Sequence, residues 1–179
     1  VIDGALRPSV DAEPHRALYL SFPEIAAIAH THSTFATAFA QAERDIPVLG
    51  TTHADVFDGP VPCARPLTQA ECDDRYEQHT GTALAAVVIQ RGKPVMGVPA
   101  ALAANHGPFS WGASPAEAVS HARVCEAVAE LAVLTLQLSP DASPPAHVID
   151  LHYRRKHGPH ATYGNPEFTA SLPSRQRSR

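Results

Sequence analysis

The sequence predicts one layered domain of mixed helices and strands, of the α/β or α+β class. Strong helix-start signals alternate with short apolar runs bordered by turn residues, a pattern typical of helices packed on a sheet. The 179 residues suffice for one well-packed domain, and no repeat or linker divides them. We therefore expect a domain over residues 1–165 and a polar, disordered tail over residues 166–179.

Helices and strands alternate through the first third of the chain. Asp11 is well placed as a helix N-cap, and a short helix is expected over residues 13–21. Residues 25–32 form an apolar run ending in His-Thr-His, which is typical of a mostly buried strand. Ser33 is then expected to cap a helix that continues to about residue 43.

The middle of the chain combines weak strand signals with one strong helix signal. We expect a short strand at residues 48–51. Thr68 and Glu71 have the spacing of a capping box and predict the start of a helix. The apolar runs at residues 83–88 and 100–105 are ambiguous by period, although turn-rich borders favour a strand for the second.

The last third of the chain is predicted to be largely helical. Ser114 as N-cap, Pro115 at the first helical position and Glu117 as the capping-box acid together predict a helix. This helix is expected to end at about Leu138, before a proline. A final helix is expected over residues 147–157.

Composition argues against several classes of function. A formal net charge of −4 gives no basic surface for nucleic acid or an anionic membrane. No apolar run approaches the length of a membrane span, and no signal peptide is recognisable. Three cysteines without CxxC spacing argue against a disulfide framework and favour a reducing compartment. We therefore expect a soluble, cytoplasmic protein with neither nucleic acid nor membrane among its partners.

The strongest chemical signal is the sequence His30-Thr31-His32. Residues two apart in a strand face the same side, so both imidazoles can converge on one metal ion. Taken alone, the pair also fits two hydrogen-bonded histidines at a strand end. His106 follows the apolar run that ends at Asn105, and beside His32 it would complete a three-histidine site with open positions for substrate.

Three further residues are candidates for ligand or acid–base roles. Asp11 has two readings, as an additional metal ligand or simply as a helix cap. Asp55 lies in a predicted loop, where it is either a catalytic carboxylate or a solvated one. Tyr163 is a candidate acid, because a nearby cation can lower the pKa of a phenol.

Four segments, in order and spacing, resemble the L-ribulose-5-phosphate 4-epimerases of the class II aldolase family. They read HTHS, GTTHADVFDGPVPCAR, NHGPFSWG and DLHYRRKHG followed by TYG, and the likeness extends from about Arg7 to Gly164. The resemblance implies a three-layer α/β/α sandwich around a largely antiparallel sheet. It also implies a homotetramer with active sites between neighbouring subunits.

The resemblance implies a zinc site with a defined chemistry. His30, His32 and His106 match the family's metal ligands, and Asp11 matches the aspartate that accompanies them. Zinc, or alternatively manganese or cobalt, would act as a Lewis acid in a retro-aldol cleavage of the C3–C4 bond of a sugar phosphate. Re-addition of the rotated aldehyde then inverts C4. The histidines must be neutral to bind metal, so we expect activity to fall at acidic pH.

The resemblance also implies roles in proton transfer and substrate binding. Asp55 matches the catalytic acid/base of the epimerases, and Tyr163 matches a tyrosine contributed by the neighbouring chain. His152 and Arg155 match a late histidine and arginine near that shared site. Ser9 matches a hydroxyl that contacts the substrate phosphate.

The sequence departs from the family pattern at two places. Family members begin well before the residue that matches Val1, and their upstream segment carries phosphate-binding loops and strands. The family's Ser-Ser-Asp is Ser9-Val10-Asp11 here, so one phosphate-binding hydroxyl is replaced by an apolar side chain. We therefore expect a fold that is incomplete at the N-terminus and weaker binding of the substrate phosphate.

Three other functions stay open. A catalytically impaired metal-binding homologue, or a truncated gene product, would fit these departures. A fuculose- or rhamnulose-phosphate aldolase would use the same metal and release the fragments, but the fuculose type has glutamate where Asp11 stands and lacks GTTHAD. A histidine-rich metal buffer fits poorly, because the histidines here are embedded in apolar segments instead of tracts.

Overall fold

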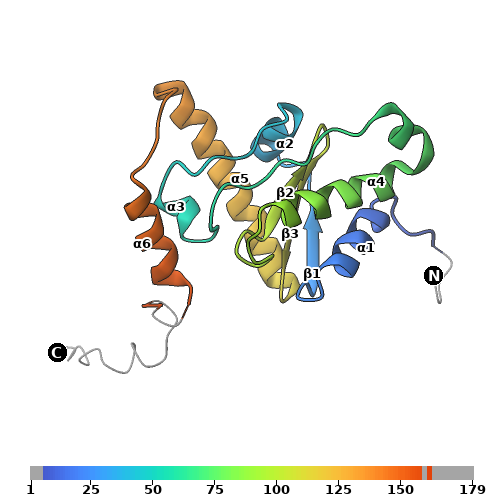
Figure 1. The fold of residues 1–179 in the computed structure, drawn as a ribbon, viewed down its shortest axis with the longest axis horizontal. Helices are drawn as coiled ribbons and strands as arrows, with labels where there is room; N and C mark the ends of the chain where they lie inside the picture. The colour runs from blue at the N-terminus through green and yellow to red at the C-terminus, as the bar shows by residue number, and fades with distance from the viewer. Residues whose placement is uncertain (1–5, 159–160, 163–179) are drawn as a thin grey trace, which may run out of the picture.

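The computed structural model describes residues 6–158 and 161–162 of the chain. Across these residues the elements are α1 (Ala12–Ser21), β1 (Ala27–His30), α2 (Thr34–Gln41), α3 (Thr51–Ala54), α4 (Gln69–Gln90), β2 (Ala100–Ala103), β3 (Gly107–Gly112), α5 (Pro115–Leu138) and α6 (Ala146–Lys156). The strands form one antiparallel sheet in the order β1-β3-β2, with helices around it (Figure 1). The predicted α/β class and antiparallel sheet are confirmed.

Two hydrophobic cores separate three layers of structure. One core lies between α1, α4 and one face of the sheet, and the other lies between α2, α5 and the opposite face. The alternation of side chains along a strand explains this division. Phe109 and Trp111 of β3 enter the first core, whereas Ser110 faces α5 and its hydroxyl donates to the carbonyl of Ala118 at 3.1 Å. The sheet is therefore the middle layer of an α/β/α sandwich.

Strand β3 begins directly after His106. The Gly107-Pro108 pair predicts a strand end, yet both residues lie in β3, which pairs with β1 and β2. Pro108 cannot donate a ladder hydrogen bond, but its carbonyl oxygen still accepts the Thr31 N–H at 3.3 Å. On the other side of β3, the N–H of Leu102, which lies opposite Pro108 in β2, donates to the Pro62 carbonyl at 2.7 Å.

Two other expectations for the first half of the chain are wrong in detail. The predicted strand at residues 48–51 is absent, and α3 begins at Thr51. The predicted strand at residues 25–32 is shorter, because β1 ends at His30 and leaves His32 in the connection to α2. Ser33 occupies the N-cap position of α2 without a capping hydrogen bond from its side chain.

Helix α4 begins at the predicted capping box, is kinked near its start and packs its second half against the first core. The predicted capping box is confirmed, since Glu71 N–H donates to Thr68 Oγ1 at 3.3 Å and Thr68 N–H donates to Glu71 Oε2 at 2.8 Å. The helix is kinked at Arg75, where φ is −133° and ψ is 71°. Residues 83–88, which are ambiguous in the sequence, are helical and face the first core.

The C-terminal helices follow the sequence prediction closely. Helix α5 begins after Ser114, whose hydroxyl accepts from Glu117 N–H at 3.2 Å, and it ends at Leu138. Helix α6 has no buried residue and lies beside α3 at the edge of the molecule (Figure 1). None of the helices that the structure describes has the length and hydropathy needed to cross a membrane. The tail predicted at residues 166–179 lies outside the described residues.

Candidate metal centre and acid–base pair

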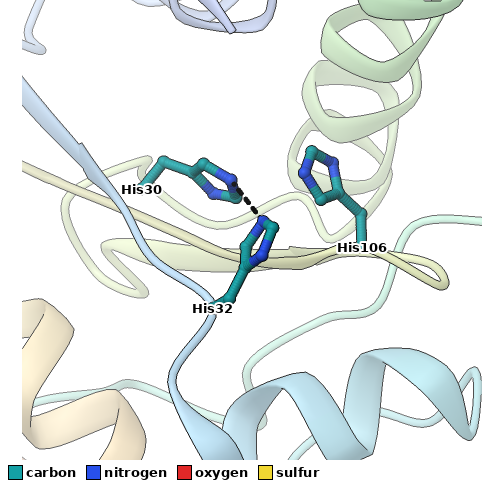
Figure 2. Close-up of side chains that lie close together, drawn as sticks. All are labelled: His30, His32 and His106. Carbon is teal, nitrogen blue, oxygen red and sulfur yellow. Dashed lines mark hydrogen bonds between the residues drawn. The ribbon is translucent and has the colours of Figure 1, made fainter.

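Three histidines from two distant parts of the sequence meet at one end of the sheet. His30, His32 and His106 each direct a ring nitrogen inward, and these atoms lie within 4.8 Å of one another (Figure 2). The Nε2 atoms of His30 and His32 are 3.2 Å apart. Two nitrogens that bind zinc tetrahedrally at about 2.0–2.1 Å would lie about 3.3 Å apart. The spacing of His30 and His32 therefore fits two nitrogens that bind the same metal ion.

His30 is fixed on two sides by β3. Its ring stacks on Phe109, its cross-strand partner, with centroids 4.1 Å apart and an interplanar angle of 18°. Its Nδ1 lies 3.0 Å from the carbonyl oxygen of Pro108. A carbonyl only accepts, so Nδ1 must carry the proton, and the lone pair of Nε2 is left facing the cluster. This arrangement sets both the ring orientation and the tautomer that metal binding requires.

His106 is presented by the hairpin turn between β2 and β3. Asn105 adopts a left-handed conformation (φ 60°), which asparagine tolerates better than most residues, and its amide donates to Glu43 Oε1 at 3.0 Å. The ring centroids of His30 and His106 are 4.7 Å apart, and those of His32 and His106 are 4.9 Å apart. Within the described part of the chain, the buried Nδ1 of His106 has no hydrogen-bond partner. The cluster thus retains an unsatisfied nitrogen.

The electrostatics of the cluster favour the neutral forms of His30 and His106. Burial lowers the pKa of His30, and the neighbouring His106 and His32 lower it further, against the opposing hydrogen bond to Pro108. Burial and the neighbouring His32 likewise lower the pKa of His106. Neutral histidine is the form that binds a metal. Donor type, spacing and protonation state therefore all fit a divalent transition metal, although the geometry does not select one ion.

Asp11 lies close enough to influence the cluster but is not among its converging ligands. It occupies the predicted N-cap position of α1, but its side chain makes no capping hydrogen bond. Its negative charge raises the pKa of His30 and His106, against the larger effect of burial. The role of Asp11 as a metal ligand stays a prediction. Ser9 is its local partner, because Asp11 N–H donates to Ser9 Oγ at 3.3 Å.

A second polar group forms where α6 packs on α3. Asp55 follows α3, and its Oδ1 lies 3.1 Å from Nδ1 of His152 on α6. The side chains are 34% and 29% exposed respectively, so the contact is partly shielded from solvent. A third residue, His157, places Nε2 3.0 Å from the main-chain oxygen of Asp55. The structure therefore joins Asp55 and His152, which are 97 residues apart in the sequence.

Of the remaining predicted site residues, the structure describes Arg155 but does not join its side chain to these groups. Arg155 is exposed on α6, and its main-chain carbonyl accepts the N–H of Thr162 at 2.9 Å. Tyr163 lies outside the described residues. Among residues 6–158 and 161–162, no recorded hydrogen bond or ion pair joins the pair Asp55–His152 to the three histidines.

Sequence reasoning missed several residues that shape the two groups. Phe109 and Pro108 orient His30, and a period-2 reading of residues 107–112, with Phe109 and Trp111 on one face, would have predicted their strand. Tyr76 lies with its ring centroid 6.5 Å from that of His106, and only the tertiary fold reveals this. His157 gave no signal beyond its place in the last motif.

Comparisons with known proteins agree with this geometry. A model of the class II aldolase and adducin N-terminal domain matches residues 1–133. The L-ribulose-5-phosphate 4-epimerase UlaF of Salmonella paratyphi C is 42% identical over 167 residues, which are 92% of this chain and 72% of the relative. The same named protein of Salmonella typhi gives the same identity and coverage.

Solved structures show the same fold. An L-fuculose 1-phosphate aldolase superposes with a TM-score of 0.71 at 21% identity, covering 86% of this chain and 66% of that one. YgbL from Klebsiella pneumoniae superposes with a TM-score of 0.60 at 27% identity, covering 83% of this chain and 67% of that one. The chain thus spans about two thirds of the length of these solved structures.

Proposed function

Because the chain belongs to the class II aldolase and adducin family, we propose that it is a metal-dependent L-ribulose-5-phosphate 4-epimerase. The reaction would convert L-ribulose 5-phosphate to D-xylulose 5-phosphate. The observation that carries the proposal is the convergence of His30, His32 and His106 in a chain that is 42% identical to proteins named as this epimerase. Zinc is the proposed ion, since three neutral imidazoles with further positions open are typical of catalytic zinc, and manganese and cobalt are the alternatives.

The required chemistry explains why a metal is needed. The hydrogen on C4 is not adjacent to a carbonyl, so inversion requires that the C3–C4 bond break and form again. The bond electrons stay with the three-carbon fragment, and the C4 hydroxyl loses a proton to become the aldehyde of glycolaldehyde phosphate. A metal held by the three histidines would supply Lewis-acid stabilisation of the negative charge that develops on the three-carbon fragment.

Asp55 and Tyr163 are the proposed proton-transfer groups on the two faces of the aldehyde. The carboxylate of Asp55 would accept the proton of the C4 hydroxyl during cleavage. His152, held to Asp55 Oδ1, would orient that carboxylate and share the proton. After the aldehyde rotates and is attacked on its other face, the new C4 oxygen needs a proton, which Tyr163 would donate. Ser9 and Arg155 are the proposed partners of the substrate phosphate.

The separation of the two polar groups favours a shared active site. In one chain, Asp55 and His152 lie where α6 packs on α3, whereas the histidine cluster lies at the end of β1 and the β2–β3 hairpin. A homotetramer in which the acid–base pair of one copy faces the metal of the next would bring both to one substrate. Closed rotational symmetry would create identical sites of this kind.

A turnover assay with L-ribulose 5-phosphate and zinc tests the proposal. We expect D-xylulose 5-phosphate to form, and we expect chelation to abolish it. Asp55→Asn should lower kcat by about a hundredfold or more, because a positioned acid/base contributes about 10²–10⁴ in rate. Asp73→Asn, at an exposed position on α4, is the matched control and should retain wild-type activity. Turnover that survives both chelation and Asp55→Asn would rule the mechanism out.

The same assay separates the proposal from its alternatives. Accumulation of free dihydroxyacetone and glycolaldehyde phosphate, with no xylulose product, would identify an aldolase. Stoichiometric metal binding without either outcome would identify a catalytically impaired homologue.

A further inference from the structure

Polar contacts connect helix α6 and the residue that follows it to the end of α3. None of its residues is buried, and its packing partner among the elements is α3 (Figure 1). The residues on its inner side, which include His152, Tyr153 and His157, are half-buried. Val148 and Ile149 are half-buried too, but no apolar residue of α6 is fully buried, so specific hydrogen bonds help to set the position of the helix on α3.

Two of these contacts meet on a single residue, Asp55. His152 Nδ1 lies 3.1 Å from the carboxylate oxygen Oδ1, and His157 Nε2 lies 3.0 Å from the main-chain carbonyl oxygen. The carbonyl only accepts, so Nε2 of His157 must carry the proton and donate it. The two histidines therefore hold both the side chain and the backbone of Asp55, and neither bonds Oδ2.

His157 is itself held rigidly by Tyr153. Their rings stack with centroids 4.3 Å apart and an interplanar angle of 19°, and His157 N–H closes the helix by donating to the Tyr153 carbonyl at 3.0 Å. The hydroxyl of Tyr153 reaches the neighbouring loop, 3.6 Å from the point where a Cβ of Gly97 would stand. Asp58 N–H donates to the carbonyl of that glycine at 2.7 Å. This stack therefore links His157 to the loop that contains Gly97, which is itself bonded to the segment after α3.

We propose that His157 is a positioning residue for Asp55. By holding the Asp55 main chain against α6, it sets the distance at which His152 reaches the carboxylate and leaves Oδ2 for the substrate. This inference rests on the proposed function for its kinetic consequence but not for its structural one. A displacement of a reacting group by about 1 Å is enough to lower a rate by up to a hundredfold.

Two substitutions separate the hydrogen bond from the ring stack. His157→Phe retains an aromatic ring against Tyr153 but removes the N–H donor. His157→Gln retains an N–H donor of similar reach but loses the stack. Arg154→Ala is the control on the same helix, because its side chain is 78% exposed and pairs with Asp150, whose side chain is 64% exposed.

The kinetic test compares kcat and KM among these variants in the intact protein. We expect His157→Phe to lower kcat for L-ribulose 5-phosphate by about tenfold with KM changed less than about twofold. His157→Gln should recover most of that loss, and Arg154→Ala should match the wild type. A general structural role would instead lower the amount of folded enzyme in both His157 variants, with kcat per folded active site unchanged, and that result would overturn the proposal.

A second readout does not depend on catalysis. The ¹⁵N resonances of His152 report which ring nitrogen is protonated, and the contact with Asp55 requires a proton on Nδ1. We expect this tautomer in the wild type and in His157→Gln, and a mixture of tautomers in His157→Phe. An unchanged tautomer in His157→Phe would overturn the positioning role. An inactive wild type with the expected tautomer change would refute the proposed function and still support the positioning role.

Discussion

Gly107 is the residue on which the packing of the histidine cluster depends most directly. A Cβ at this position would lie 2.7 Å from the carbonyl oxygen of Thr31 and 3.3 Å from Cδ2 of His32. Thr31 separates the first two histidines, so its displacement would move both. We expect Gly107→Ala to weaken zinc binding by about 10- to 100-fold, the range typical of lost supporting contacts at metal sites. Titration against a competing chelator measures the change.

Gly50→Ala is the matched control for this substitution. Its backbone is extended, with φ of −174°, and an added Cβ would meet no atom within 4 Å. The control should bind zinc like the wild type. Equal zinc affinity in Gly107→Ala and Gly50→Ala would contradict the packing argument.

His53 makes stability depend on pH. Burial lowers its pKa to about 4, against the opposing hydrogen bond from Nε2 to the Gly59 carbonyl. An unfolded chain binds this proton at a pKa of about 6.5, so between pH 6.5 and 4 the unfolded state holds more protons than the folded one. The stabilisation is therefore complete above pH 6.5 and is lost as the pH falls towards 4, by an amount on the order of 3 kcal/mol.

Denaturant unfolding at several pH values measures this dependence. We expect His53→Gln, which retains an N–H donor but does not titrate, to lose less stability than the wild type between pH 6.5 and 4. Other half-buried histidines contribute equally to both proteins, so the difference isolates His53. Parallel pH profiles for the two proteins would show that His53 is not the source.

At the scale of elements, the crossing of α1 and α4 is closely packed. A Cβ on Gly81 would lie 2.6 Å from Cβ of Ala17 and 2.8 Å from Cα of Pro14. We expect Gly81→Ala to destabilise the protein by about 1–2 kcal/mol, because overpacking by about 1–3 kcal/mol exceeds the gain in helix propensity of about 1 kcal/mol.

Chemical denaturation measures this effect against a control on the same helix. Thr82→Ala changes an exposed neighbour whose hydroxyl donates to the Gln78 carbonyl, and we expect it to change stability by about 0.5 kcal/mol or less. A stabilised Gly81→Ala protein would mean that α1 moves freely away from α4.

The sequence predicted the starts of α4 and α5 correctly, because each depends on residues within one helical turn. The Ser114 cap and the Thr68–Glu71 capping box lie within one helical turn, and both appear in the structure. The four-residue α3 has no period to detect, and Pro108 lies within β3 although proline usually marks the end of a strand. These features depend on neighbours in space, which a sequence window does not contain.

The candidate site divides in the same way. The spacing of His30 and His32 predicts that they face one side, and their proximity is visible in the structure, even though β1 ends before His32. The approach of His152 to Asp55 spans 97 residues and leaves no trace in local periodicity. Resemblance to a family named both residues, whereas His157 required the packed structure.

At the scale of the whole molecule, the central prediction is that each active site uses two chains. Asp55→Asn chains have an intact histidine cluster, and His106→Ala chains have an intact acid–base pair. If sites are shared, an equal random mixture of the two variants should recover roughly a quarter of wild-type activity. Each site then has about a one-half chance of an intact histidine cluster and about a one-half chance of an intact acid–base pair from the neighbouring chain. Differential tags confirm subunit exchange. Complete inactivity of verified mixed oligomers would place both groups in one chain.

The measurement that tests the account most directly is the rate of D-xylulose 5-phosphate formation as a function of bound zinc. The metal-free protein is loaded stepwise, and bound metal and initial rate are measured in the same samples. The account predicts a rate that rises linearly to one zinc per chain and stays at zero for His106→Ala under identical loading. A rate that is independent of bound zinc, or that persists in His106→Ala, would contradict the assignment of this three-histidine cluster as the catalytic metal centre.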